Sequence, residues 1–187
     1  MEDQIKLVLL IGTVRAERLT ERVSKFVTRE LSEKFSHVSV KVFDVRYLSM
    51  PMDDDGPVLG NANTDYKSAV REMDALLIVS PEYNHSFPGT LKRALDMLDI
   101  PDCLHKAVGV VGVSNGTFGG ARMTESLLPV VRTLGLVSIK PDQYFPKAQE
   151  SLTEDGVALQ PIVGESFGKF MTELLWMANT LRAGRTT

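Results

Sequence analysis

Short apolar runs alternate with amphipathic stretches along this chain, and the alternation constrains the fold more than any other feature. The first run, residues 7–11, is continuously apolar, which is typical of a strand buried on both faces of a sheet. The following stretch carries apolar residues at three- and four-residue spacing, as on one face of a helix: Leu19, Val23, Phe26, Val27 and Leu31. The pattern predicts an α/β fold whose parallel sheet is covered on both faces.

The strand-helix unit is predicted five times. The expected strands cover residues 7–11, 38–42, 75–79, 108–113 and 136–139, and helical patterns follow each of them. Right-handed crossovers between parallel strands favour the strand order 2-1-3-4-5, with the alternating second strand at an edge. No internal repeat or linker divides the sequence, so residues 1–187 are expected to form one domain.

Composition excludes several classes of function. The chain has 21 basic and 24 acidic residues, so it lacks the basic excess that would neutralise a nucleic-acid backbone. Its single cysteine, Cys103, excludes an internal disulfide and a cysteine-based zinc cluster, and it suits a reducing compartment. No signal-peptide pattern is present, and no apolar run approaches the roughly 20 residues of a membrane span. We expect a cytoplasmic protein without a membrane or nucleic-acid partner.

Two long connections interrupt the regular pattern, at residues 46–63 and 141–161. Loops of this length in a compact domain usually cover a site or an interface. The first contains three consecutive acidic residues, Asp53, Asp54 and Asp55. They lack the alternating ligand spacing and the terminal Glu of a calcium loop, so a solvated loop is favoured and no metal site is predicted.

Ligands of open parallel sheets bind beyond the carboxyl ends of the strands, so the loops there are candidate sites. The first of them, residues 12–20, turns at Gly12 and leads into a helix whose free N–H groups suit an anion. Four side chains could join them: Thr13, Arg15, Arg18 and Thr20. The alternative is a capped helix with two solvated arginines. The loop matches neither the Walker pattern nor Gly-x-Gly-x-x-Gly, which disfavours a dinucleotide held in Rossmann fashion.

The second candidate loop, residues 80–89, contains Pro81, which fixes the backbone, and then several N–H groups before the next helix. Such a rigid turn can hydrogen-bond a planar heterocycle that packs near Tyr83. The alternative is that Ser86 caps the helix and Tyr83 only fills space. His85 is interpreted as a loop residue rather than a base or a metal ligand, because the other two histidines are distant in sequence.

The third candidate loop, residues 114–122, contains three glycines that permit a positive φ angle and a close backbone approach to a flat ligand: Gly116, Gly119 and Gly120. A glycine-rich turn is weak evidence by itself. The stronger indication is that three specialised loops, each at the carboxyl end of a strand, are expected to converge on one crevice.

These motifs together resemble the NAD(P)H-dependent FMN reductases of the flavodoxin-like superfamily, over residues 5–136. The run Pro81-Glu82-Tyr83-Asn84, followed by residues 88–96, is similar to a characteristic run of that family. The segment Gly12-Thr13-Val14-Arg15 resembles its Gly-Ser-x-Arg phosphate loop. The sequence departs from the pattern at three positions, where many members have Ser for Arg18, Asn for Thr20 and Tyr for Asn115.

The resemblance implies a flavodoxin-like three-layer sandwich that binds FMN. Four residues would hold the FMN phosphate: Thr13, Arg15, Arg18 and Thr20. The backbone of the second loop would hold one edge of the isoalloxazine, through Pro81, Glu82, Tyr83, Asn84 and His85. The third loop would hold the pyrimidine edge, through Ser114, Asn115, Gly116, Gly119 and Gly120. The family also implies a homodimer or homotetramer with the flavin near the interface.

The expected function is that of an oxidoreductase that passes hydride from NAD(P)H to bound FMN and on to a small acceptor such as a flavin, quinone, azo compound or metal oxyanion. Because the flavin carries the chemistry, no catalytic side chain is predicted. One alternative is a flavodoxin-type electron carrier without NAD(P)H activity, which Arg15, Arg18 and the modest net charge of −3 disfavour. Another is a receiver-type signalling domain, whose acidic residues after the first and third strands are replaced here by Gly12-Thr13 and Ser80-Pro81.

Overall fold

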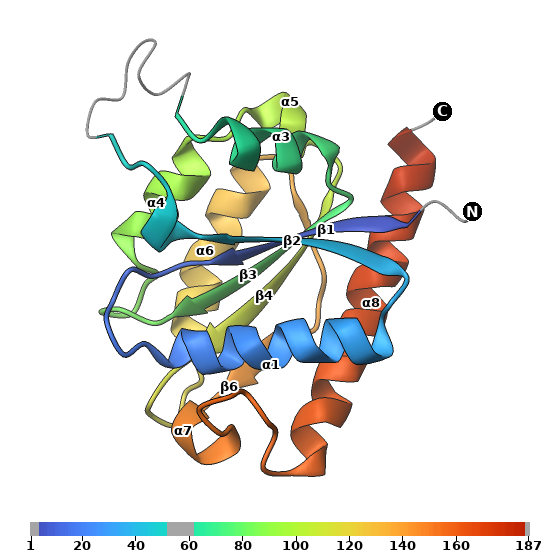
Figure 1. Cartoon of the computed structure of the whole chain (residues 1–187). Coiled ribbons are helices and arrows are strands. Elements are labelled where there is room, and N and C mark those ends of the chain that lie inside the picture. Colours follow the sequence, from blue (N-terminus) through green and yellow to red (C-terminus); the bar gives the residue numbers. More distant parts are fainter. Residues whose placement is uncertain (1–3, 52–61, 186–187) are drawn as a thin grey trace.

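The computed structural model describes residues 4–51 and 62–185. A parallel sheet of six strands forms its centre, with the main order β2-β1-β3-β4-β5 and with β6 also paired to β4 (Figure 1). The strands are β1 Ile5–Ile11, β2 Val38–Asp44, β3 Ala75–Pro81, β4 Ala107–Val113, β5 Val137–Ser138 and β6 Gln143–Phe145. The predicted α/β class and strand order are confirmed, and β6 is an addition that the sequence pattern did not predict.

Helices cover both faces of the sheet in a three-layer arrangement (Figure 1). One layer contains α1 Leu19–Lys34, α7 Ala148–Ser151 and α8 Pro161–Arg185. The other contains α3 Thr64–Glu72, α4 Gly89–Asp96, α5 Ile100–Cys103 and α6 Ala121–Thr133, and a short 3₁₀ helix, η1 Val45–Tyr47, follows β2. The apolar spacing noted for residues 19–31 correctly indicated the buried face of α1, where Val23, Phe26 and Val27 are fully enclosed.

The continuous apolar run of β1 fits its position in the middle of the sandwich. Leu7 and Leu9 belong to the core under α1 and α8, whereas Val8 and Leu10 belong to the core under α3 and α4. All pairings within the sheet are parallel, so the carboxyl ends of β1, β3 and β4 lie at one edge. The three candidate loops therefore leave the sheet at that edge, where the site is built.

The far edge of the sheet differs from the prediction. The expected strand at residues 136–139 is reduced to β5, and residues 141–161 form β6 and α7 instead of one long loop. Pro141 lies between the two short strands and has no N–H to donate, which accounts for the interrupted ladder. The segment supports the third candidate loop, because Ser114 N–H donates to the Phe145 carbonyl at 3.1 Å and Ala148 N–H donates to the Ser114 carbonyl at 3.0 Å.

The other long connection is described only at its two ends, and its acidic triplet lies outside the described residues. The ends are held together by the Asn63 side chain, whose Oδ1 accepts from Ser49 N–H at 2.8 Å and whose Nδ2 donates to the Ser49 carbonyl at 2.7 Å. Arg93 of α4 donates through Nε to the Pro51 carbonyl at 2.9 Å. Both ends of this connection are therefore fixed against the α4 side of the sandwich.

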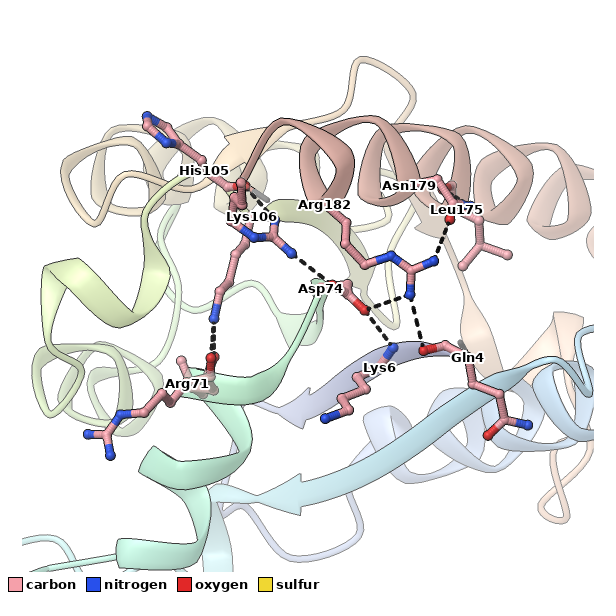
Figure 2. A network of polar contacts seen from close by, with 11 residues as sticks. Gln4, Lys6, Arg71, Asp74, His105, Lys106, Leu175, Asn179 and Arg182 are labelled. Carbon is pink, nitrogen blue, oxygen red and sulfur yellow. Dashed lines mark hydrogen bonds and ion pairs between the residues drawn. The ribbon is translucent and has the colours of Figure 1, made fainter. Parts of the chain in front are cut away.

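A polar cluster around Asp74 joins α8 to the opposite, amino-terminal edge of the sheet (Figure 2). Asp74 Oδ2 accepts from Lys6 N–H at 3.0 Å and lies 3.6 Å from Arg182 Nη1, while Oδ1 accepts from Arg185 Nη2 at 2.7 Å. The buried Lys106 donates to two carbonyls at the end of α3, and burial lowers the pKa of its ammonium group. The cluster lies away from the candidate loops.

Cys103 ends α5 and is fully buried in the core between the sheet and the helices α3 to α6. Burial raises the pKa of its thiol to about 11.

Candidate functional site

The three candidate loops line one pocket of about 290 Å³ at the carboxyl edge of the sheet. The first loop contributes all four predicted anion ligands, Thr13, Arg15, Arg18 and Thr20; the second contributes Pro81, Glu82 and Tyr83, and the third contributes Ser114 and Asn115. An adjoining open pocket of about 760 Å³ shares part of this lining and extends over Asn84 to the start of α4. The structure thus brings the three loops together.

The end of the pocket at α1 has the properties of an anion site. Thr20, in the first turn of α1, is 1% exposed, and its Oγ1 has no hydrogen-bond partner among the described residues. No side chain caps α1, so its first N–H groups are not occupied by a cap. Arg15 is exposed beside them and lines both pockets. A free hydroxyl, uncapped N–H groups and a guanidinium together suit a phosphate group.

Arg18 is held differently from Arg15. Its side chain is 5% exposed, and Nη1 lies 2.8 Å from Asp44 Oδ1, while Nη2 bonds Oδ2 and Nη1 also bonds the Thr13 carbonyl. Burial alone would raise the pKa of Asp44, but the hydrogen bonds from Arg18 and Arg46 N–H outweigh it and lower that pKa. Arg18 Nε is buried without a partner among the residues described, so this N–H is the part of Arg18 left for a ligand.

The alternative interpretation of the first loop, a capped helix with two solvated arginines, does not describe the structure. The helix has no side-chain cap, and Arg18 is enclosed rather than solvated. The sequence could not reveal this difference between the two arginines, because the partner of Arg18 lies 26 positions further along the chain.

The second loop contains a rigid turn, but it lies at residues 83–86 and not at Pro81, which is the last residue of β3. Tyr83 N–H donates to the Ser86 carbonyl at 2.7 Å, and Ser86 N–H donates to the Tyr83 carbonyl at 2.9 Å. Between them, Asn84 and His85 both have a positive φ angle, of 50° and 65°, which is the backbone of a type I′ turn. Ser86 is not the helix cap of the alternative interpretation, because α4 begins at Gly89 with Pro88 at its N-cap.

Two side-chain contacts connect the second loop to its neighbours. Tyr83 Oη lies 2.8 Å from Thr13 Oγ1, which joins the second loop to the first. Glu82 Oε1 accepts from Arg122 Nε at 2.6 Å and also from Arg122 Nη2, and the Arg122 guanidinium lies 4.6 Å from the centre of the Phe118 ring. No role was predicted for Arg122; the available signal was a basic residue at the end of the third loop, in the first turn of α6.

Two of the three glycines of the third loop, Gly119 and Gly120, pack against the sheet rather than line the pocket. Gly119 and Gly120 have φ angles of 62° and 90°; a Cβ on Gly119 would lie 2.8 Å from Cβ of Tyr144, and one on Gly120 would lie 3.0 Å from Cα of Gly112. Gly116 has open space around it. The glycines let the loop fold back onto β4 and β6, and a contact of theirs with a ligand stays a prediction.

Comparison with known proteins decides the family. The sequence model described as NADPH-dependent FMN reductase matches residues 5–150. The chain belongs to this family. It is 28% identical over 171 residues to a 2-hydroxy-1,4-benzoquinone reductase from a Burkholderia species, covering 89% of this chain and 90% of the relative. It is 27% identical over 188 residues to an NAD(P)H-dependent FMN reductase of Pseudomonas aeruginosa, covering 95% and 97% of the two chains.

Solved structures agree on the fold of this FMN reductase family member. The flavoenzyme NAD(P)H:(acceptor) oxidoreductase FerB from Paracoccus denitrificans superposes with a TM-score of 0.75 at 22% identity, over 92% of this chain and 97% of that one. A flavodoxin from Pseudomonas aeruginosa gives a TM-score of 0.54 at 16% identity, over 96% and 98%. The flavodoxin-like fold and the family resemblance predicted from the sequence are confirmed, as is the enzyme class, an oxidoreductase that depends on FMN and NAD(P)H.

The site of this FMN reductase fits the cofactor of its family. The unpartnered Thr20 hydroxyl and the uncapped start of α1 offer donors to a phosphate, and the adjoining open pocket offers room beside the rigid second loop. Within the described part of the chain, no three His, Cys, Asp or Glu side chains lie close enough together to hold a metal ion. No helix among the same residues is long and apolar enough to cross a membrane.

Proposed function

We propose that the crevice holds FMN with its phosphate at the start of α1, and that the enzyme transfers hydride from NAD(P)H through this FMN to a small acceptor of the quinone type. The observation that carries the proposal is the pocket in which Thr20 Oγ1 is buried without a partner, next to uncapped helix N–H groups and the exposed Arg15. A dianionic phosphate is the group that such a set of donors stabilises best.

The four first-loop residues divide into two roles in this proposal. Thr20 and Arg15 donate directly to the phosphate, and Thr13 contributes its backbone while its hydroxyl bonds Tyr83. Arg18 donates a hydrogen bond to the Thr13 carbonyl, and the ion pair with Asp44 holds the guanidinium in place for that bond. Arg18 then offers the phosphate only its Nε–H. This ion pair thereby helps to fix the conformation of the phosphate loop, together with the hydrogen bond from Arg46 Nη2 to the Arg15 carbonyl at 2.7 Å.

The isoalloxazine is proposed to lie against the second loop, in the adjoining open pocket that Tyr83 and Asn84 line. The type I′ turn keeps the N–H groups of this loop in one arrangement, and the third loop holds the pyrimidine edge from Ser114 onward. When bound, FMN supplies the group that accepts and returns the hydride. The side chains of the enzyme then bind and orient the flavin, and none of them is required as an acid or a base.

A quinone is the favoured acceptor because two relatives are named for quinone substrates, the benzoquinone reductase from Burkholderia and a quinone reductase from Pseudomonas putida. The enzyme is also proposed to act as a homodimer or homotetramer in the cytoplasm. Three exposed apolar side chains support association at the carboxyl edge of the sheet: Val14 at 46%, Tyr47 at 80% and Phe118 at 61% exposure. A second copy over this edge would cover them.

The proposal is tested by anaerobic mixing of the FMN-loaded protein with NADPH or NADH, followed by a panel of quinones, azo dyes, chromate and free FMN. Rapid bleaching of the yellow flavin by the nicotinamide alone, followed by reoxidation by a quinone, supports the reductase. A flavin that stays oxidised with both nicotinamides identifies an electron carrier of the flavodoxin type instead. Equal affinity of the apoprotein for riboflavin and FMN contradicts the phosphate site.

A further inference from the structure

Glu82 has one carboxylate oxygen that nothing in the described part of the chain satisfies. Its side chain is 8% exposed, and while Oε1 accepts from Arg122, Oε2 is buried without a hydrogen-bond partner. Glu82 lines both the 290 Å³ pocket and the open pocket beside it, so a ligand that fills them contacts this residue. Burying a carboxylate oxygen away from water without a hydrogen-bond donor raises the free energy of the folded protein. A ligand that donates a hydrogen bond to this oxygen removes that penalty.

The chemistry of the missing partner follows from the charge of Glu82. A carboxylate repels phosphate oxygens and ring carbonyls, so the partner is an N–H or O–H donor. FMN has such donors in two places, the imide N3–H of the ring and the hydroxyls of the ribityl chain. We propose that Glu82 Oε2 accepts a hydrogen bond from one of these donors, and that the side chain, not only the backbone, of this residue binds the cofactor. This inference rests on the FMN site proposed above.

Arg122 acts as a positioning residue for this contact. It bonds Oε1 through both Nε and Nη2, which fixes the position of that oxygen, and Phe118 lies against its guanidinium. Arg122 also determines what a Glu82→Gln variant would do. The amide oxygen must accept from Arg122, so the amide NH₂ takes the place of Oε2 and opposes a donor on the ligand.

The test uses the apoprotein, titrated with FMN and two analogues that keep the phosphate. 3-Methyl-FMN lacks the N3–H donor, and a flavin with a phosphopentyl side chain lacks the ribityl hydroxyls. The wild-type protein is expected to bind one of them on the order of tenfold to a hundredfold more weakly than FMN, since a hydrogen bond to a charged group is lost. The analogue that loses affinity identifies the donor.

Glu82→Gln is expected to bind FMN at least about tenfold more weakly than the wild type, and to lose the preference for FMN over that analogue. Glu125→Gln is the matched control, because this exposed residue of α6 undergoes the same change of charge outside the pocket, and its affinities should equal those of the wild type. If the analogues identify N3–H as the donor, a second readout is the midpoint potential of the bound flavin, which should become less negative in Glu82→Gln because a negative charge beside the ring is removed.

The inference is wrong if Glu82→Gln binds FMN as tightly as the wild type, or if its discrimination between FMN and the analogues is unchanged. Wild-type protein that binds FMN and both analogues equally would also overturn it, and this arm needs no folded variant. A wild-type protein that fails to bind FMN at all contradicts the proposed cofactor site itself, so the two failures are distinguishable.

Discussion

Arg18 Nη1 lies 2.8 Å from Asp44 Oδ1, and this ion pair joins the start of α1 to the end of β2. Because Arg18 also bonds the Thr13 carbonyl, the pair fixes the loop that is proposed to bind phosphate. The two side chains are 5% and 12% exposed, so solvent screens the pair only weakly. The contact therefore stabilises the fold and, in the proposed function, the loop that binds the FMN phosphate.

Asp44→Ala should lower the free energy of unfolding of the apoprotein by about 3–5 kcal/mol, because it leaves the Arg18 guanidinium buried without its counter-ion. Urea unfolding followed by circular dichroism measures the change. Asp96→Ala is the control, since the Lys92–Asp96 pair is an exposed contact on α4 and its loss should cost about 0.5 kcal/mol or less. Equal destabilisation by the two changes would contradict a special role for Asp44.

The contribution of Asp44 to the free energy of unfolding should depend on pH. Its pKa is lower in the folded protein than the usual value of 3.8, so the ionised pair stabilises the fold above about pH 4, and the contribution is lost as the pH falls through the lowered pKa. The stability difference between wild type and Asp44→Asn should be constant from about pH 5 to 7 and shrink below about pH 4. A stability difference that grows on acidification would show that folding raises the pKa of Asp44 instead of lowering it.

Arg15→Ala should weaken FMN binding on the order of tenfold to a hundredfold without changing the thermal midpoint of the apoprotein, because Arg15 is exposed and only the phosphate contact is lost. Fluorescence titration of the apoprotein measures the affinity. Arg29→Ala, in α1 but outside the two pockets at the crevice, should retain the wild-type value. An unchanged affinity in Arg15→Ala would show that this arginine is only a solvated residue.

His85→Gln should retain the rate of flavin reduction by NAD(P)H within about tenfold, because no side chain is required as an acid or a base. Loss of a true general acid would instead lower the rate by about 10²–10⁴. His85 is exposed at the tip of the type I′ turn. Its φ of 65° fits the second central position of that turn, so its backbone has a structural role that does not involve the imidazole. Stopped-flow spectroscopy separates flavin reduction from reoxidation by the acceptor. A hundredfold loss in either half-reaction, with FMN still bound, would identify His85 as catalytic.

Asp74→Ala should destabilise the fold by about 3 kcal/mol and leave FMN affinity unchanged, because Asp74 joins α8 to the edge of the sheet opposite the site. Denaturant unfolding and FMN titration of the same variant test the two parts. A loss of FMN affinity that matches the loss of stability would show that the two edges of the sheet are coupled.

The regular part of the fold could be predicted from the sequence because each long strand and helix carries a clear periodicity. The fifth strand was located within residues 136–139, but its shortening to the two residues of β5 was not predicted, nor was β6, which has only three residues and too short a pattern to recognise. The position of β6 depends on pairing with β4, which sequence alone does not reveal. The strand order followed from general rules of handedness and needed no such detail.

For the candidate site, the position of the loops could be predicted from the sequence, but the contacts of their side chains could not. The three loops were located correctly because parallel strands end at one edge, but the partners of individual side chains were not predictable. Arg15 and Arg18 look equivalent in the sequence, and only the approach of Asp44 from β2 separates them. In the same way, the pairing of Glu82 with Arg122 depends on contacts between residues 40 positions apart.

The burial of Cys103 has a practical consequence. It is the single cysteine of the sequence, it is 0% exposed, and burial raises the pKa of its thiol to about 11, so it stays protonated and shielded at neutral pH. A cysteine introduced at an exposed position such as Trp176, on the outer side of α8, would be the one thiol open to maleimide reagents. The wild-type background is thus already suited to attaching a single fluorophore or spin label without removing a native cysteine.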